Sequence, residues 1–359
     1  MANTTCAQID LKFTHTFLPT VYILVFIIGF FANCCGLTSV FRSWKKLGNI
    51  NVFILNLGVA DLLYVFTLPF LVVYYATNSR WIFGRSFCKV TRFLFNLNLY
   101  CSIGFLTCIS VYRYLGIVHP MKVMGRITTR HSVLISILVW FLVIIQILPD
   151  MFFDKTPRNS SEACFDTTAD YLMTRYLPYS AAWTFTGFCV PLLIILVCYG
   201  HVAVVLATKA NINVLLKQRC LKLVVMLVIL FSVCFIPYHI LRNLNLKTRI
   251  LKKQGMCSER FNDIYIAYQV SRGLVCMNSA INPLMYLVGN DDFLLRFHDI
   301  SKRARRRIAA RCVVGYLFRG AFKLASKGTA SSEEGTTNIW LNLNTPQVAV
   351  GKAYHMYTV

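Results

Sequence analysis

The stretch that decides the fold runs from Tyr268 to Tyr286 and reads YQVSRGLVCMNSAINPLMY. It is apolar enough to lie in a bilayer, yet it carries Arg272 near one end. The other end carries an Asn-Pro-x-x-Tyr pattern, formed by Asn282, Pro283 and Tyr286. An arginine at the centre of a span costs about 2.5–3.5 kcal/mol even on insertion-based scales, so it marks a functional site. A proline there leaves a backbone carbonyl that neighbouring groups must satisfy. One end of this helix is therefore suited to an anion, and the other is suited to bending.

Composition places the rest of the chain in a membrane as well. Of 359 residues, 57% are hydrophobic and only 14% are charged, whereas soluble domains carry about 25% charged residues. Seven apolar stretches exceed the roughly 20 residues needed to cross a hydrocarbon core, and they lack the period-two alternation of barrel strands. We therefore predict an all-α membrane protein, a bundle of seven transmembrane helices near 18–41, 50–75, 89–117, 132–153, 177–206, 220–243 and 262–288.

Basic residues set the expected orientation. They follow spans one, three, five and seven, and such loops are cytoplasmic by the positive-inside rule. The first 17 residues are polar and lack the pattern of a cleavable signal peptide. We predict a multi-pass plasma membrane protein with residues 1–17 outside and a seven-transmembrane domain over 18–290. The glycosylation acceptors Asn3 and Asn159 both fall on the outer side in this orientation.

One outer loop departs from the rule. Between spans six and seven, the sequence carries a group of basic residues: Arg242, Lys247, Arg249, Lys252, Lys253 and Arg260. One interpretation is a solvated basic loop. The other is an electrostatic funnel that raises the local concentration of an anionic ligand.

Four cysteines also fall on the predicted outer side, which is the oxidising side. They are Cys6, Cys88, Cys164 and Cys257, and they allow three pairings, between which spacing does not choose. The other ten cysteines lie mostly inside spans and are interpreted as small buried hydrophobic residues.

The chain changes character after the last span. Residues 291–312 combine an amphipathic segment with a basic run, and are expected to lie on the inner membrane surface against anionic lipid. Residues 313–359 become polar and rich in serine and threonine. This composition predicts a largely disordered cytoplasmic tail that is open to phosphorylation.

The order of several landmarks resembles a rhodopsin-like G-protein-coupled receptor from residue 18 to about residue 300. The landmarks are, in chain order, Asn33, the LNLGVAD run ending at Asp61, Cys88, the Tyr112-Arg113-Tyr114 triplet, Trp140, Pro191, Tyr199, the Phe231-x-x-Cys-Phe-x-Pro237 run and the Asn-Pro-x-x-Tyr pattern. Finer patterns resemble the purinergic nucleotide-receptor branch, closest to members responsive to ADP and ATP. They are the WIFG run at 81–84, CFDTT at 164–168, PYHILR at 237–242 and YQVSRGL at 268–274. The resemblance implies disulfides Cys88–Cys164 and Cys6–Cys257, a heterotrimeric G protein of the phospholipase-coupled class with calcium signalling, and possible partners in arrestin and receptor kinases.

The proposed ligand site also follows from helical spacing. Residues at i, i+3 or i+4, and i+7 share a helix face, and three spans then each place a basic residue outermost with aromatic or amide groups deeper. Phosphates favour arginine forks, and a base favours stacking and amide edges. The alternative is that each arginine snorkels to the interface. The predicted ligand set is Arg92, Asn96, Tyr100, Asp166, His239, Arg242, Asn245, Arg249, Tyr265, Tyr268, Gln269 and Arg272.

The inner half carries the expected switch. By resemblance, G-protein coupling and switching involve Arg113, Tyr199, Phe235, Pro237, Asn282, Pro283 and Tyr286, and an allosteric sodium ion is held by Asp61, Asn33, Ser102, Asn278, Ser279 and Asn282. The family pattern has an acid before the arginine, and this chain has Tyr112 there. The resting ionic lock is therefore absent, which is expected to raise basal activity.

Other classes fit less well. No nucleophile–base pair or metal cluster shares a face, so an enzyme is not expected, nor is a cofactor beyond the sodium ion or a nucleic-acid partner. An opsin needs a lysine in the last span, and residues 262–288 contain none. The closer alternative is a receptor for a dicarboxylate such as succinate or 2-oxoglutarate, which also uses a His-x-x-Arg pattern and an arginine in the seventh span. Base preference, and di- versus triphosphate, stay open.

Overall fold

The computed structural model describes residues 12–42, 49–119, 128–157, 162–208 and 225–283, all within one compact unit spanning residues 1–294. These parts are helical and contain no strand. The predicted juxtamembrane helix at 291–312 and the tail at 313–359 lie outside the described residues, as do Cys6, Asn3, Asn159 and Tyr286. The predicted all-α class is confirmed.

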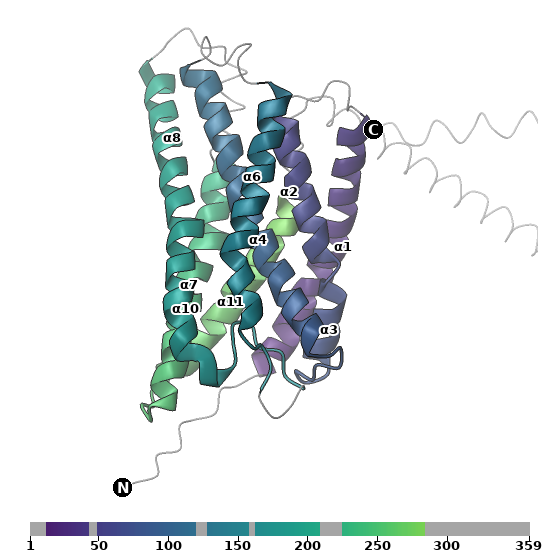
Figure 1. Cartoon of the computed structure of the whole chain (residues 1–359), viewed down its shortest axis with the longest axis vertical. Coiled ribbons are helices and arrows are strands. Elements are labelled where there is room, and N and C mark those ends of the chain that lie inside the picture. The colour runs from purple at the N-terminus through teal and green to yellow at the C-terminus, as the bar shows by residue number, and fades with distance from the viewer. Residues whose placement is uncertain (1–11, 43–48, 120–127, 158–161, 209–224, 284–359) are drawn as a thin grey trace, which may run out of the picture. The chain divides into compact units, whose positions relative to one another are not determined.

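The helices of the described residues lie alongside one another (Figure 1). In chain order they are α1 (Lys12–Arg42), α2 (Asn49–Val65) with α3 (Leu68–Ala76), α4 (Arg85–Val118), α6 (Thr129–Ile147), α7 (Met173–Thr184) with α8 (Val190–Thr208), α10 (Ile236–Lys253) and α11 (Arg260–Ile281). Among the described residues, six spans are long and apolar enough to cross a membrane. The seventh, α11, is more polar because it carries Arg272 and several amide side chains.

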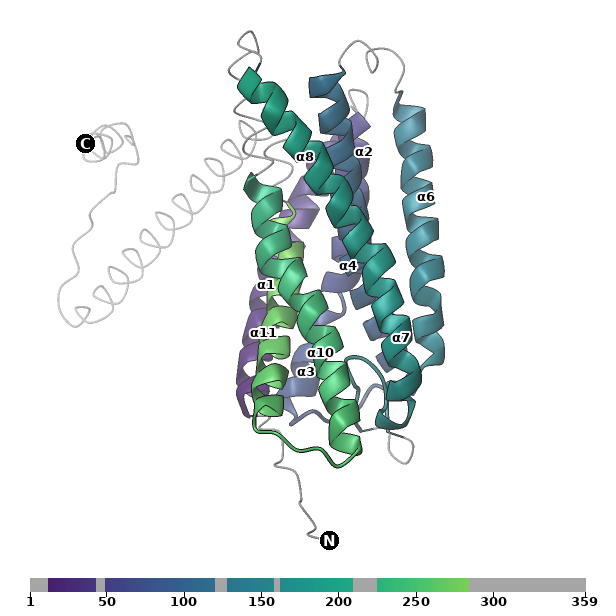
Figure 2. The same ribbon diagram turned by 90° about the vertical axis from the view of Figure 1, so that its left-hand side faces the viewer.

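The central helix is α4, which packs against α2, α6 and α8, while α11 packs against α1 and α10. Figure 2 shows α6 at the edge of the bundle, with α8 inclined across α4. The outer face of α6 is apolar and open: Leu134 is 65% exposed and Ile137 is 59% exposed. Such a face is costly in water and is satisfied by lipid.

Prolines interrupt the predicted spans. The second span divides at residues 66–67 because Pro69 has no N–H for the carbonyl of Val65. At this break, the Thr67 hydroxyl donates to the neighbouring Tyr64 carbonyl at 2.7 Å. The fourth span likewise leaves the α-helical form at Ile147 and continues as a 3-10 turn, η2 (Leu148–Phe152), which contains Pro149.

Two π-helical segments were not predicted. They are η4 (Phe185–Cys189), just before Pro191, and η5 (Leu230–Phe235), just before Pro237. A π-turn adds one residue to the helical repeat and re-aims the side chains that follow it, and such turns cluster at functional sites. At Gly187 within η4, a Cβ would lie 2.6 Å from a ring carbon of Tyr100, so only glycine permits this close approach.

The basic segment after Pro237 is helical, which corrects the loop predicted between spans six and seven. Helix α10 continues to Lys253 because no proline or glycine interrupts it before Gly255. It ends in a Schellman motif: Gly255, with φ of 82°, donates to the Lys252 carbonyl and Met256 donates to the Leu251 carbonyl, both at 3.1 Å. The only loop left between α10 and α11 is residues 254–259.

Candidate functional site

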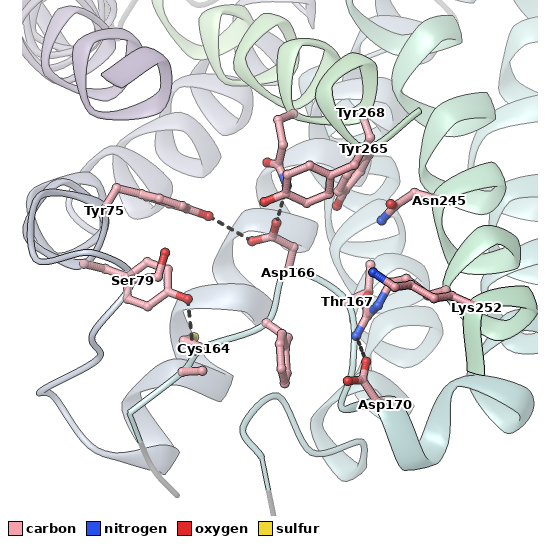
Figure 3. Close-up of a pocket in the computed structure, with 15 residues that line it drawn as sticks. Tyr75, Ser79, Cys164, Asp166, Thr167, Asp170, Asn245, Lys252, Tyr265 and Tyr268 are labelled. Carbon is pink, nitrogen blue, oxygen red and sulfur yellow. Dashed lines mark hydrogen bonds and ion pairs between the residues drawn. The ribbon is translucent and has the colours of Figure 1, made fainter. Parts of the chain in front are cut away.

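A cavity of about 490 Å³ opens at the end of the bundle that carries the Cys88–Cys164 disulfide, here called the disulfide end. Its wall combines α3, the segment 163–170, α10 and α11 (Figure 3). Six predicted ligand residues line it: Asp166, Asn245, Arg249, Tyr265, Tyr268 and Gln269. The other six are buried beneath or beside it rather than on its wall: Arg92, Asn96, Tyr100, His239, Arg242 and Arg272.

The Asp166 carboxylate joins two of the predicted arginines. It lies 3.1 Å from Arg92 and forms a second ion pair with Arg272. It also accepts hydrogen bonds from the Tyr75 hydroxyl at 3.3 Å and the Gln269 amide at 3.2 Å. Burial opposes its ionisation, but the two arginines prevail and lower the pKa of Asp166 from its ordinary value. Asp166 therefore pairs with two cations, one on α4 and one on α11.

The disulfide places Asp166 in this position. Cys164 is bonded to Cys88 in the first turn of α4, as the resemblance implied. The Cys164 carbonyl also accepts a hydrogen bond from Arg92 at 3.1 Å, one helical turn further along α4. Cys257 is disulfide-bonded too, and its predicted partner Cys6 lies outside the described residues.

Arg272 is 2% exposed and is surrounded by hydroxyl and amide groups. Its guanidinium donates to the Tyr22 hydroxyl, to the Tyr75 hydroxyl at 2.7 Å and to the Gln269 side-chain oxygen at 3.1 Å. Snorkelling is excluded for this arginine because its head group is buried with its stem.

Arg242 has different surroundings. It donates to the hydroxyls of Tyr100 at 3.3 Å and Tyr176 at 2.9 Å. Its guanidinium lies 4.4 Å from the ring centroid of Trp183, within the range of a cation–π contact. It is 1% exposed, and no carboxylate of the described residues lies within ion-pair distance.

A buried ion pair beside Arg242 was not predicted. The Lys155 ammonium lies 2.6 Å from Asp150 and also donates to the Thr167 carbonyl. Asp150 further accepts hydrogen bonds from Tyr176 at 2.9 Å and Asn96 at 3.2 Å. Burial lowers the pKa of Lys155 although Asp150 opposes the shift. An acid inside the predicted fourth span was the available signal, since such residues are expensive in a membrane.

The buried charges do not balance. Four cationic side chains, each at most 3% exposed, face two carboxylates; the cations are Arg92, Lys155, Arg242 and Arg272, and the carboxylates are Asp150 and Asp166. Two positive charges are therefore in excess. An uncompensated buried charge costs several kcal/mol, so this region favours an anion.

Deeper groups offer recognition without charge. His239 is 1% exposed, neither ring nitrogen has a hydrogen-bond partner, and its ring stacks on Phe188 at 4.2 Å.

Arg249, at the rim, bonds to Thr167 at 2.9 Å and pairs with Asp170. Figure 3 shows Asn245 and Lys252 facing the cavity from α10.

Near the middle of the bundle, a polar cluster surrounds Asp61, which lies about halfway along the span Asn49–Ala76. Its carboxylate accepts from Asn98 at 2.7 Å and from Asn282 at 3.0 Å, and Asn282 also approaches the Ser102 hydroxyl at 3.4 Å. Ser279 reaches Asp61 through Asn98, at 3.1 Å from the Asn98 oxygen. Asn98 was not in the predicted set, although an asparagine within an apolar span was a signal.

The remaining predicted sodium ligands, Asn33 and Asn278, are not hydrogen-bonded to Asp61 in the described structure. The Asn33 amide donates to the Gly29 and Ser279 carbonyls, at 2.8 and 2.9 Å. The side-chain oxygens of Asn33, Asn278 and Asn282 are buried and have no hydrogen-bond partner. Unpartnered amide oxygens beside a carboxylate are the donor set that a hard cation uses.

The predicted switch residues within the described part of the chain lie on α4, on α8, at the junction of η5 with α10, and at the end of α11. The Tyr199 hydroxyl donates to Ser110 at 3.1 Å, and the Tyr112 hydroxyl accepts from Asn49 at 3.0 Å. Phe235 is fully buried at the end of the π-turn before Pro237, and Pro283 follows α11. Arg113, half-buried on α4, comes directly after Tyr112.

Comparison with known proteins agrees with this arrangement. Residues 32–286 match the 7 transmembrane receptor (rhodopsin family). The chain is 41% identical to purinoceptor 1 of Homo sapiens over 309 residues, which cover 85% of this chain and 82% of that protein. This chain belongs to the rhodopsin family of seven-transmembrane receptors, in its purinoceptor branch. Purinoceptor 1 of Gallus gallus is also 41% identical, over 85% of both chains. The 2-oxoglutarate receptor 1 of Rattus norvegicus is 37% identical over 81% of this chain and 86% of its own.

Family membership settles the broad predictions. This receptor is a multi-pass protein of the plasma membrane, and its family is a receptor family rather than an enzyme class. The higher identity to the purinoceptors favours the nucleotide interpretation over the dicarboxylate one.

Proposed function

We propose that this receptor binds an extracellular nucleotide of the ADP or ATP kind at its disulfide end and activates a heterotrimeric G protein at the other. The observation that carries the proposal is the excess of two buried positive charges beside the cavity. A ligand with several negative charges on adjacent phosphates offsets that excess, whereas a neutral ligand does not. The purinoceptors at 41% identity supply the nucleotide class.

The geometry suggests how phosphates enter. Arg92 and Arg272 are held together by Asp166, so a phosphate oxygen that approaches them competes with this carboxylate. Arg242 has only hydroxyl and aromatic partners among the described residues, and a phosphate would supply its missing counter-charge. The base would lie against the Tyr265 and Tyr268 rings, with amide edges from Asn245 and Gln269.

The ligand class is tested with a panel applied outside intact cells: ADP, ATP, UTP, UDP, succinate and 2-oxoglutarate. We expect calcium responses to at least one adenine nucleotide and weaker or no responses to the carboxylates. Comparing the calcium response with a cyclic-AMP response in the same cells tests coupling to the phospholipase-coupled class of G protein. Because the agonists do not cross the membrane, a response also places the disulfide end outside. Responses to carboxylates alone would replace the nucleotide assignment with the second candidate, which the 2-oxoglutarate receptor relative supports.

Near the middle of the bundle, we infer that Asp61 holds a sodium ion with the oxygens of Asn282, Ser102 and their neighbours. The support is the set of unpartnered amide oxygens near a buried carboxylate. Bound sodium would supply a counter-charge and favour the resting arrangement of α2, α4 and α11. We expect Asp61→Asn to remove the dependence of agonist affinity on sodium concentration, measured by ligand displacement in sodium or choline chloride. An unchanged sodium dependence would contradict this assignment.

Basal signalling belongs to the same proposal. In place of an acid before Arg113, the receptor has Tyr112, whose hydroxyl is bonded to Asn49. We propose that Arg113 contacts the G protein, and that basal activity is raised because a tyrosine takes the place of the acid that the family pattern has before this arginine. Nucleotide exchange on a purified G protein without agonist measures this activity, and an exchange rate equal to that of receptor-free vesicles would contradict it.

A further inference from the structure

The Tyr176 hydroxyl lies between two charged groups that each hydrogen-bond in one sense only. It is 2.9 Å from the Asp150 carboxylate and 2.9 Å from the Arg242 guanidinium. A guanidinium can only donate, and an ionised carboxylate can only accept. Asp150 forms an ion pair with Lys155 at 2.6 Å, so its oxygens accept here. The single Tyr176 proton is therefore directed toward Asp150, and the Tyr176 oxygen is directed toward Arg242.

Packing and hydrogen bonds hold this arrangement in place. Tyr176 is 1% exposed, with the Lys155 ammonium 4.8 Å from its ring centroid and the Phe153 ring centroid 5.0 Å away. Both oxygens of Asp150 are occupied: Tyr176 and Lys155 share one, and Asn96 donates to the other at 3.2 Å. The carboxylate and the hydroxyl are thus fixed before a ligand binds.

The orientation of Arg242 follows from these contacts. Its two terminal nitrogens donate to different helices, one to Tyr100 on α4 at 3.3 Å and the other to Tyr176 on α7 at 2.9 Å. The Trp183 ring lies against the guanidinium at 4.4 Å. A guanidinium has five N–H groups, and the described residues accept hydrogen bonds from two of them. The fork is therefore held in one plane while N–H groups are left for an anion.

We propose that Asp150 and Tyr176 are positioning residues that orient Arg242 toward a phosphate group of the ligand. The inference rests on the proposed nucleotide function, in which a phosphate is the counter-charge of Arg242. Neither Asp150 nor Tyr176 lines the cavity, so both act through the arginine rather than on the ligand. An arginine that is already oriented loses less conformational freedom when the ligand binds, and the ligand binds more tightly for that reason.

A purely structural role for the Tyr176 hydroxyl, as a link between α7 and α10, is less consistent with the contacts around it. The same two helices are joined a turn away by Asn243, which accepts from the Ser180 hydroxyl at 2.8 Å and donates to Thr184 at 3.0 Å. The helices therefore stay connected when the Tyr176 hydroxyl is removed. Its loss is expected to affect ligand potency more than stability.

A double-mutant cycle on the full-length receptor tests the link between Tyr176 and Arg242. The measurement is calcium potency in intact cells, with the most potent nucleotide of the panel as agonist. Tyr176→Phe keeps the ring and is expected to lower potency by about tenfold, the lower range for a hydrogen bond to a charged group. In an Arg242→Lys background, which has no planar fork to orient, the same change is expected to cost less than about threefold. Fully additive losses would overturn the proposal.

Tyr179→Phe is the matched control. Tyr179 lies one turn further along α7, and its hydroxyl donates to the Gln146 carbonyl at 3.0 Å rather than accepting from Arg242. We expect its removal to change potency by less than about twofold. The ligand-free melting temperatures of Tyr176→Phe and Tyr179→Phe are expected to agree within about 2 °C. A much lower melting temperature for Tyr176→Phe, with an equal loss of potency in both backgrounds, would assign Tyr176 a structural role.

The part played by Asp150 is tested with the neutral pair Asp150→Asn and Lys155→Met. An asparagine offers Tyr176 either an oxygen or an N–H group, so it no longer dictates where the tyrosine proton points. The pair is expected to lower potency by about three- to tenfold in the parent and by less than about twofold in Tyr176→Phe. A full further loss in Tyr176→Phe would show that Asp150 acts by another route.

The cycle also separates this inference from the function on which it rests. If Arg242→Lys loses potency and Tyr176→Phe does not, the positioning role is refuted and the phosphate contact of Arg242 stands. If neither variant loses potency, the phosphate contact itself is refuted.

Discussion

Replacing Arg242 with alanine is expected to weaken the nucleotide response by at least about thirtyfold, because a buried charge pair between ligand and protein contributes about 2–5 kcal/mol. Arg242 is 1% exposed and has no carboxylate partner among the described residues. A phosphate would be its only full counter-charge. The measurement is a calcium concentration–response curve for the most potent agonist of the panel, with surface expression measured in parallel and expected to persist.

Two variants on the same helix control for this result. Arg242→Lys keeps the charge but loses the fork that contacts both Tyr100 and Tyr176, so an intermediate loss of about tenfold is expected. Lys253→Ala removes an exposed cation at the end of α10 and should change potency by less than about twofold. Equal losses for Arg242 and Lys253 would indicate a diffuse effect of net charge. Unchanged potency in Arg242→Ala would refute the site.

Arg272→Ala is expected to abolish potency as well, but with a second consequence. Arg272 also holds Asp166 against α11, and Asp166 belongs to the segment tied to α4 by the disulfide. Its loss should therefore lower thermal stability in the absence of ligand, whereas Arg242→Ala should lower it less. Comparing the melting temperatures of the two ligand-free variants separates ligand contact from loop anchoring.

The sequence predicted the helices well because lipid imposes a strong and local constraint. An apolar run of about 20 residues in a membrane has to be helical, so seven spans could be found without tertiary information. The deviations arise at prolines, which interrupt the predicted spans near Pro69 and Pro149 and follow the two π-turns. A proline predicts a break but not its form, because the form depends on which neighbours satisfy the freed carbonyl.

The candidate site was predictable in its cations and less so in its anions. Arg92, Arg242 and Arg272 stood out because each lies within an apolar helix, and the structure buries all three. The double pairing of Asp166 depends on where a disulfide-tethered loop folds, which helical periodicity does not encode. The partnership of Asp150 with Lys155 was missed for a related reason: the chain turns at η2 and brings back a lysine five residues later.

The Asp150–Lys155 pair is expected to matter most for stability. Replacing Lys155 with methionine should lower the free energy of unfolding by about 3–5 kcal/mol, because Asp150 is then buried without its cation. Both side chains are 1% exposed, so solvent cannot replace the lost partner. The expected drop in melting temperature is about 5–10 °C, measured by thermal unfolding of the purified receptor in detergent.

The double variant decides whether the loss reflects the charge or the packing of the lysine. Asp150→Asn with Lys155→Met removes both charges yet keeps an oxygen that accepts the hydrogen bond from Tyr176. The double variant should therefore be more stable than Lys155→Met alone. This result requires that the unpaired Asp150 carboxylate is what lowers the free energy of unfolding in Lys155→Met. The nearby pair Lys89–Asp154 serves as the matched control: its side chains are 27% and 46% exposed, and Lys89→Met should shift the melting temperature by less than about 2 °C. If the two substitutions are simply additive, the pair stabilises the receptor through packing rather than through charge.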